Sequence, residues 1–274
     1  MSTMDFDQVA AAWGRWSPQF ERGSRPISER LVQFARIGPG STVLDLGTGI
    51  GEPAITAAKA VAPGGRVVGI DVSPGMISLA RERAHREGIA NADFVAADAA
   101  AYSGDQRFDA IVSRWGLMFL PDLDASLAHY RGCLRDGGRF AAATWGAPAE
   151  VPMISLPMAV ASKRFGLPPA PLEGGPFALH DAAALRERFV ACGYQPVEVQ
   201  DVLAIFPFSS AEEYVAYIAD IAPPFNGLLR QLDPAQAAAL RKEVEEAAAA
   251  RFAGAGDEIH FPNRVIVIGA TSGA

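Results

Sequence analysis

Short apolar runs alternate with amphipathic stretches through residues 41–146. Apolar residues three and four positions apart indicate helices, whereas continuous apolar runs bounded by turn residues indicate buried strands. The predicted strands are 42–46, 66–70, 92–97, 108–112 and 139–144, and the predicted helices are 54–61, 74–87 and 123–134. Strands that alternate with helices at this spacing predict a parallel sheet joined by right-handed crossovers.

The flanking regions are predicted from weaker patterns. Residues 5–37 read as helix in two pieces, because Ser17-Pro18 and the stretch Gly23 to Pro26 interrupt the pattern. Residues 148–178 are rich in proline and small residues, which predicts irregular structure with at most a short helix near 157–164. The remaining predictions are helices at 180–192, 211–221 and 234–252 and strands at 197–206 and 264–268. The paired helices before the last strand read as an insertion above the sheet.

Composition and charge limit the classes of molecule that this protein is expected to bind. The 274 residues carry a formal net charge of −7 and no run of Lys or Arg, so the surface would repel a phosphate backbone, and we expect no nucleic-acid partner. No signal-peptide pattern opens the chain, and no apolar run approaches the roughly 20 residues of a membrane helix. We therefore expect a soluble, cytoplasmic protein. Cys133 and Cys192 lack metal-ligand spacing and are expected to be buried free thiols, with no metal site.

The stretch from Val43 to Pro53 reads as a strand, a glycine loop and a helix start. Gly47, Gly49 and Gly51 stand at alternate positions, where the missing Cβ lets the backbone turn tightly or lets a ligand approach. Pro53 suits the first turn of the following helix. Such a loop at a helix N-terminus is typical of a site for the anionic end of a nucleotide-like ligand.

Polar residues end the other predicted strands. Asp71 ends the second strand, Asp98 the third, and Ser113 with Trp115 the fourth. In an open parallel sheet, ligands bind outside the carboxyl ends of the strands. Asp71 lies about 20 residues past the glycine loop, where an acid accepts hydrogen bonds from ribose hydroxyls. Asp98 taken alone could equally well cap a loop. Loop capping does not explain why polar residues stand at the ends of several successive strands.

A dinucleotide-dependent oxidoreductase offers a similar loop and acid. Its pattern places the third glycine three residues after the second, where this chain has Glu52, and the third glycine comes one residue early at Gly51. The chain also shows no Tyr–Lys or His grouping for hydride transfer. NAD(P) binding is therefore the alternative, not the leading interpretation.

Taken together, the stretches Asp45–Gly51, Ala97–Ala99 and Ser113–Phe119, with Asp71, resemble the motifs of class I S-adenosylmethionine-dependent methyltransferases. The similarity is strongest to the ubiquinone/menaquinone-type and natural-product small-molecule enzymes. It implies a Rossmann-like, doubly wound α/β fold whose seven-stranded sheet is mostly parallel with an antiparallel last strand. It also implies a single domain over 1–274. Its expected parts are an N-terminal helical lid (1–37), a cofactor-binding core (41–146), the rest of the sheet (147–206 and 259–274) and a helical substrate lid (207–258).

The resemblance also implies a set of cofactor-binding residues. The glycine loop would hold the methionine end of the cofactor, and Asp71 the ribose. Val72 and Met76 would flank the adenine, Asp98 would meet its amine, and Trp16 in the lid would cover the methionine portion. The full set is Trp16, Asp45, Gly47, Thr48, Gly49, Gly51, Asp71, Val72, Met76, Asp98, Ala99 (beside the adenine), and Ser113 and Arg114 (on the cofactor's open side).

The acceptor and the base stay open. Methylation at oxygen or carbon generally needs a base near the methyl group, whereas an unprotonated amine does not. No catalytic residue is identified; His260, just before the last strand, is the histidine best placed to enter the pocket, while His180 reads as a helix cap. The aromatic later chain favours an apolar or aromatic small-molecule substrate. A non-catalytic cofactor-binding protein remains the other alternative, and the chain is expected to be a monomer or homodimer.

Overall fold

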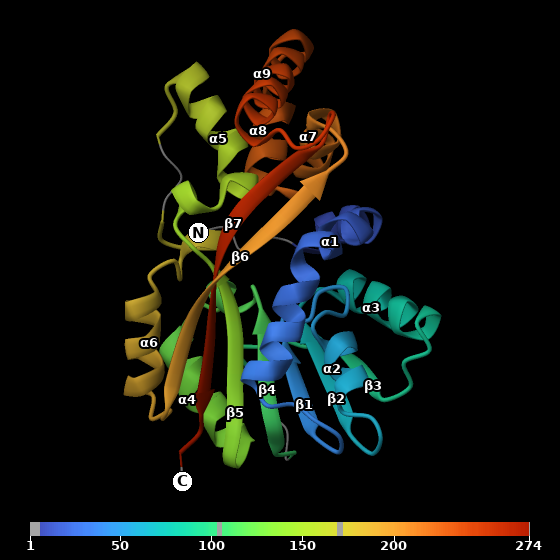
Figure 1. Cartoon of the computed structure of the whole chain (residues 1–274), viewed down its shortest axis with the longest axis vertical. Helices are drawn as coiled ribbons and strands as arrows, with labels where there is room; N and C mark the ends of the chain where they lie inside the picture. Colours follow the sequence, from blue (N-terminus) through green and yellow to red (C-terminus); the bar gives the residue numbers. More distant parts are fainter. Residues whose placement is uncertain (1–5, 103–105, 169–171, 274) are drawn as a thin grey trace. The chain divides into compact units, whose positions relative to one another are not determined.

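A seven-stranded sheet with the order β3-β2-β1-β4-β5-β7-β6 organises the fold (Figure 1). The computed structural model describes residues 6–102, 106–168 and 172–273. The strands are β1 Thr42–Leu46, β2 Arg66–Asp71, β3 Ala92–Ala96, β4 Phe108–Arg114, β5 Leu134–Trp145, β6 Val197–Phe208 and β7 Ile259–Thr271. Strands β1 to β5 pair in parallel and β7 pairs antiparallel with β5, which confirms the predicted fold class.

The register of the parallel strands brings their carboxyl ends together. Leu46 of β1 pairs with Ile70 of β2, and Asp71 at the end of β2 pairs with Ala96 of β3. On its other side β1 pairs with β4, with Asp45 opposite Val112. The polar residues predicted at the strand ends therefore share one edge of the sheet.

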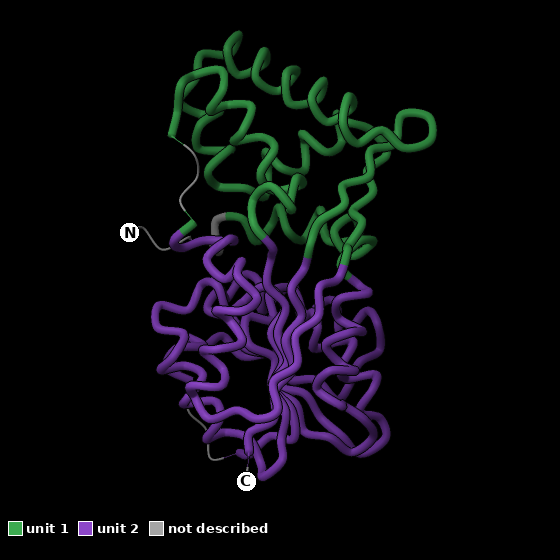
Figure 2. Tube along the Cα trace, turned by 60° about the vertical axis from the view of Figure 1, so that its left-hand side comes forward, with its two compact units in different colours: residues 1–24, 147–172, 203–264 green, residues 25–146, 173–202, 265–274 purple. Residues whose placement is uncertain are grey.

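Helices flank the sheet on both of its faces (Figure 2). The α-helices are α1 Ala10–Phe34, α2 Ala54–Ala60, α3 Pro74–Arg86, α4 Leu123–Cys133, α5 Pro152–Phe165, α6 Ala182–Ala191, α7 Ala211–Ile221, α8 Pro223–Gln231 and α9 Pro234–Phe252, and the 3₁₀ turns are η1 Phe6–Val9, η2 Leu117–Phe119, η3 Pro148–Glu150 and η4 Gly175–Phe177. Helices α2, α3 and α4 each connect strands that lie in the same sheet, as the sequence pattern predicts.

Contacts group the chain into two compact units (Figure 2). Unit 1 comprises residues 1–24, 147–172 and 203–264. Unit 2 comprises residues 25–146, 173–202 and 265–274, and therefore contains the parallel strands and the glycine loop. The sequence-based division into lid, core and insertion stays a prediction.

Helix α1 is continuous, so the prediction of two pieces was wrong. Pro18 and Pro26 lie inside its 25 residues. An interior proline removes a backbone hydrogen bond and costs about 3 kcal/mol in an isolated helix. Burial offsets that cost, because Ile27 and Leu31 on the same helix are fully buried. Tertiary packing therefore overrides the local signal.

Two further helices contain or begin at prolines that were read as breaks. Helix α5 has Pro152 in its first turn and Pro157 in its interior, where only a short helix was predicted. Helix α8 begins at Pro223, within the stretch 222–224 that the sequence pattern indicates as a break between helices. A proline in the first helical turn loses no hydrogen bond, because the N–H it lacks has no partner in the helix. Pro152 and Pro223 thus start helices, and Pro157 is accommodated within one.

Aromatic side chains form much of the core of unit 1. The ring of Phe208 lies 5.1 Å from Tyr217 and 5.4 Å from Tyr214 between centroids. Tyr214 in turn packs 4.3 Å from Phe261. All four side chains are at most 2% exposed. The aromatic richness that suggested an aromatic substrate thus also builds a packed interior.

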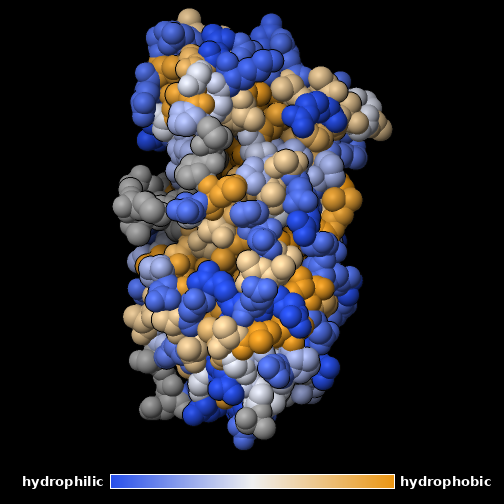
Figure 3. Space-filling model, turned by 90° about the vertical axis from the view of Figure 1, so that its left-hand side faces the viewer, coloured by the Kyte–Doolittle hydropathy of each residue, from blue (hydrophilic) through white to orange (hydrophobic). Residues whose placement is uncertain are grey.

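Apolar and hydrophilic residues are mixed on the face of the molecule that Figure 3 shows. On the face seen in Figure 3, hydrophilic residues separate the apolar ones into small patches. Among the described helices, none is long and apolar enough to cross a bilayer. Within the same residues, no three His, Cys, Asp or Glu side chains come together as a metal site. Cys133 and Cys192 are free thiols, but half-buried where burial was expected.

Gly23 of α1 tests the packing of unit 1. A Cβ at this position would lie 2.6 Å from the ring of Phe206 and 2.7 Å from the Ile205 carbonyl oxygen. We expect Gly23→Ala to lower the free energy of unfolding by about 1–3 kcal/mol, as overpacking does. The matched control is Gly132→Ala in α4, where a Cβ meets nothing within 4 Å. There we expect a gain of up to about 1 kcal/mol in denaturant unfolding; equal effects at both sites would contradict this packing.

Candidate functional site

The glycine loop after β1 is fixed by backbone hydrogen bonds. Gly47, Gly49 and Gly51 have φ values of +69°, +53° and +101°, which L side chains rarely adopt. The N–H of Thr48 donates to the Ile70 carbonyl at 2.9 Å and thereby ties the loop to the end of β2. The Thr48 carbonyl then accepts from Gly51 N–H at 2.9 Å. The loop is therefore a defined turn whose positive φ values strongly favour glycine.

The three glycines differ in the space around them. A Cβ at Gly47 would lie 3.2 Å from the Gly116 backbone, and one at Gly51 would lie 3.0 Å from Ile55 and 3.4 Å from Ala80. A Cβ at Gly49 would meet nothing within 4 Å. Gly47 and Gly51 thus permit packing within the protein, whereas Gly49 faces open space.

Asp71 joins the loop to the start of helix α3. Its Oδ2 accepts a hydrogen bond from Gly49 N–H at 2.9 Å, and its Oδ1 accepts one from Ser73 N–H at 2.9 Å. Burial raises the pKa of Asp71, against the lowering effect of these two N–H donors. A carboxylate oxygen has a second lone pair, so both oxygens retain the capacity to accept from a ligand's hydroxyl groups.

Asp45 is fully buried below the loop. Its Oδ2 accepts from Ala54 N–H at 3.0 Å, at the start of α2. Burial raises the pKa of Asp45 from its ordinary value of 3.8 to about 7, although the Thr48 hydroxyl and the Ala54 N–H oppose the rise. Asp45 therefore holds α2 in place rather than presenting a carboxylate to solvent.

Four predicted adenine-side residues gather at the ends of β2 and β3. Val72 directly follows Asp71 and is 63% exposed, which is unusual for a large apolar side chain. Met76 is buried on α3, where its N–H donates to Ser73 Oγ at 3.1 Å. Asp98 is exposed and accepts from the backbone N–H two residues later, and Ala99 accepts from the Tyr130 hydroxyl. The side chains of Val72 and Asp98 are thus accessible to a ligand, whereas that of Met76 is buried and packs inside the protein.

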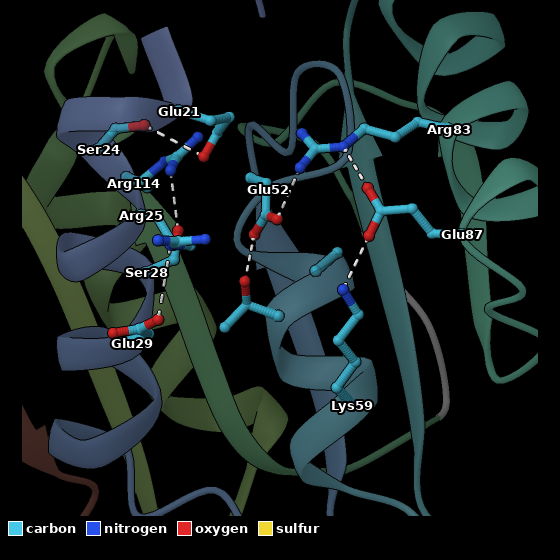
Figure 4. A network of polar contacts seen from close by, with 12 residues as sticks. Glu21, Ser24, Arg25, Ser28, Glu29, Glu52, Lys59, Arg83, Glu87 and Arg114 are labelled. Atoms are coloured by element: carbon cyan, nitrogen blue, oxygen red, sulfur yellow. Dashed lines mark hydrogen bonds and ion pairs between the residues drawn. The ribbon is translucent and has the colours of Figure 1, made fainter. Parts of the chain in front are cut away.

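Ser113 and Arg114 at the end of β4 are buried, with partners inside unit 2. Ser113 Oγ donates to the Leu46 carbonyl at 2.8 Å, and Arg114 donates to Ser28 Oγ of α1 at 2.8 Å (Figure 4). Trp115 adopts φ +60° and stacks on Trp145 with the ring centroids 4.2 Å apart. These contacts fix the backbone beside the glycine loop.

Trp16 and His260 belong to unit 1. Trp16 Nε1 donates to Asp220 Oδ2 at 2.9 Å, and its ring meets Tyr217 edge-on at 5.7 Å. His260 Nε2 lies 3.0 Å from Glu258 Oε2, with 42% of the His260 side chain exposed. Their predicted roles over the cofactor and as base stay predictions. His180 does not cap α6, because Asp181 is the N-cap residue there.

Glu52 is a site residue whose environment the sequence did not show. It is 7% exposed, and its carboxylate accepts from Thr56 Oγ1 at 2.7 Å and from Arg83 at 3.0 Å (Figure 4). A buried carboxylate needs such partners, so a Glu in a glycine loop is itself a signal for a nearby cation. Which residue of α3 supplies that cation is visible only in three dimensions.

These residues fit the cofactor that the resemblance implies. The open space over Gly49 admits a ligand to the loop. Asp71 offers a carboxylate for ribose hydroxyls, and the exposed Val72 beside it offers an apolar surface for a base. The acid and the apolar side chain are neighbours at one strand end, as a nucleoside requires.

Comparison with known proteins agrees with this geometry. Residues 37–165 match the model of a methyltransferase domain. Over 140 residues the chain is 36% identical to aklanonic acid methyltransferase DauC of Streptomyces sp. (strain C5). That match covers 51% of this chain and 62% of the relative, so the chain spans less than two thirds of the relative's length.

Solved structures share the fold at low sequence identity. The [4+2]-cyclase SpnF has a TM-score of 0.58 and 17% identity, covering 98% of this chain and 97% of SpnF. Phosphoethanolamine N-methyltransferase 2 of Haemonchus contortus, in complex with S-adenosylhomocysteine, has a TM-score of 0.55 and 20% identity, covering 91% of this chain and 53% of the nematode protein. One fold thus carries different chemistry, so the fold alone does not define the activity.

The raised pKa of Asp45 predicts a pH-dependent stability. Between its unfolded value of 3.8 and its folded value of about 7, the folded protein binds more protons, so this carboxyl's contribution is lost as pH rises towards 7. Asp45→Asn removes the titration and keeps an oxygen for Ala54 N–H. We expect the variant's stability relative to wild type to increase by about 3 kcal/mol from pH 5 to pH 8. Denaturant unfolding measures it, and a pH-independent difference would contradict the raised pKa.

Proposed function

We propose that this protein is an S-adenosylmethionine-dependent methyltransferase of a small, apolar or aromatic metabolite, since residues 37–165 match the model of a methyltransferase domain. The observation that carries the proposal is the contact between Asp71 and Gly49 N–H at 2.9 Å. It joins a ribose-type acid to a glycine loop with open space above it. We also propose that the whole chain acts as one methyltransferase domain.

In this proposal the loop and the strand ends divide the cofactor between them. The methionine end lies over the backbone at Gly49, where an added Cβ would meet nothing within 4 Å. Asp71 accepts from the ribose, Val72 packs on the adenine, and the exposed Asp98 meets its amine. Asp45, Thr48 and Met76 are buried and hold this arrangement from behind.

The chemistry required of the protein is chiefly positioning. The cofactor supplies an electrophilic methyl group on a sulfonium, which the acceptor atom attacks opposite to the leaving sulfur. The fixed glycine loop and strand ends orient the reacting groups, an effect that is worth several kcal/mol in such reactions. Exclusion of water strengthens it.

The substrate class rests on the later chain and on the relatives. In unit 1 the half-buried ring of Trp16 offers an aromatic surface, whereas Tyr217 and Phe208 are buried in the core. The relative DauC is named for a small organic acid as its substrate. The acceptor is oxygen, nitrogen or carbon. His260, paired with Glu258, is the candidate base if one is needed. A cytoplasmic location and a monomer or homodimer belong to the same proposal.

Two measurements test this function against the alternatives. In thermal shift, we expect S-adenosylhomocysteine to stabilise the protein and NADH to leave it unchanged; stabilisation by NADH alone would replace the proposal with an oxidoreductase. Transfer of label from methyl-labelled cofactor to a metabolite pool then separates an enzyme from a non-catalytic binding protein, which would bind the cofactor and transfer nothing.

Asp71→Ala tests the ribose assignment. The variant loses the carboxylate that meets the ribose, and we expect the Kd for S-adenosylhomocysteine to rise by about 10- to 100-fold in calorimetry. The matched control is Asp93→Ala on β3, an exposed acid paired only with the exposed Arg66 in the described structure. It removes the same charge and should leave the Kd unchanged. Unchanged affinity in Asp71→Ala would remove the assignment.

A further inference from the structure

Helix α3 touches the glycine loop at three successive points. At its N-terminus, Asp71 accepts from both Gly49 N–H and Ser73 N–H. About two turns further on, Ala80 lies against Gly51, where an added Cβ would be 3.4 Å from the Ala80 side chain. Near its C-terminus, Arg83 reaches back to Glu52. The contacts follow the order of both segments.

The spacing explains why one helix makes all of these contacts. Met76, Ala80 and Arg83 stand four and three residues apart, which places them on one face of a helix. Met76 and Ala80 are buried, at 5% and 0% exposure, and the Arg83 side chain is only 14% exposed. The same face therefore supports the adenine side at one end and the glycine loop at the other.

The Glu52–Arg83 pair is the buried part of a longer network (Figure 4). Arg83 Nε also donates to Glu87 at 2.9 Å, and Glu87 accepts from Lys59 at 2.8 Å. Lys59 is 57% exposed, so that outer pair is screened by solvent, whereas the Glu52 side chain is only 6% exposed. Breaking the inner pair would leave an uncompensated charge and would release the second half of the loop from α3.

We propose that Glu52 and Arg83 are a pair of positioning residues that hold the glycine loop against α3, and so set the distance between the methionine and adenosine parts of the cofactor site. The inference rests on the proposed function. Neither residue is among those proposed above to contact the cofactor. Glu52 stands where a dinucleotide-binding pattern has its third glycine. In this chain Gly51 provides the close packing of the loop against Ala80 of α3, and the side chain of Glu52 binds Arg83.

Two ligands separate this role from a general effect on stability. S-adenosylhomocysteine spans both parts of the site, whereas 5′-methylthioadenosine carries the same adenosine and thioether without the amino-acid end. Loosening the loop at Gly51 and Glu52 should weaken the binding of S-adenosylhomocysteine. It should leave the binding of 5′-methylthioadenosine unchanged, because that ligand depends on Asp71 and Val72. A loss of fold would weaken both ligands equally.

The experiment compares Arg83→Met with Glu52→Gln/Arg83→Met by calorimetry. The double variant contains no uncompensated buried charge and should regain thermal stability. In both variants we expect the Kd for S-adenosylhomocysteine to rise at least about tenfold, and that for 5′-methylthioadenosine to change less than about twofold. Lys59→Met is the control: it breaks only the outer pair and should keep the wild-type ratio of the two Kd values.

The outcomes are distinct. A wild-type ratio in the double variant, or an altered ratio in Lys59→Met, would overturn the positioning role and leave the proposed function standing. Failure of the wild-type protein to bind S-adenosylhomocysteine would overturn the proposed function, and this inference with it.

Discussion

The carboxylate of Asp71 is the constraint on which the candidate site depends. Its two oxygens accept from Gly49 and Ser73, and so one side chain connects the glycine loop, the end of β2 and the first turn of α3. The parallel register brings β1, β2 and β3 to the same edge, but register alone leaves loops free to move. The Asp71 hydrogen bonds turn neighbouring strand ends into a single surface. The open space over Gly49 and the exposed Val72 have meaning for a ligand only because that surface is fixed.

The sequence was sufficient for the fold class and for the closeness of Asp71 to the glycine loop. Alternating strand and helix patterns predicted the sheet and placed the loop and Asp71 at one edge of it; that a ligand binds at this edge stays a prediction. Those signals are local, because a glycine at positive φ or an acid at a strand end is specified by its immediate neighbours. The breaks predicted at Pro18 and Pro26 failed because the burial of Ile27 and Leu31 outweighs a local preference.

Partners far apart in the chain could not be predicted in the same way. A buried Glu52 predicts a cationic partner, but α3 and its neighbours contain several arginines. Only the three-dimensional structure shows that the partner is Arg83. The burial of Asp45, Ser113 and Arg114 could likewise not be predicted from the sequence. The residues of one motif therefore fall into two groups: accessible ones that a ligand could contact, and buried ones that hold the backbone. A motif records position in the chain; the direction in which a side chain points is a property of packing.

Unit 1 is assembled from three stretches that are distant in sequence, and this has a consequence for biosynthesis. The partners of the first half of α1 are Asp220, Tyr217 and Phe206, with a separation of 204 residues between Trp16 and Asp220. About 200 further residues must leave the ribosome after that half-helix before the side chains that cover it are present. Contacts of such long range form slowly and leave apolar surface exposed to association during folding. The first half of α1 is therefore exposed to association until its distant partners have been synthesised, and a nascent chain needs protection there.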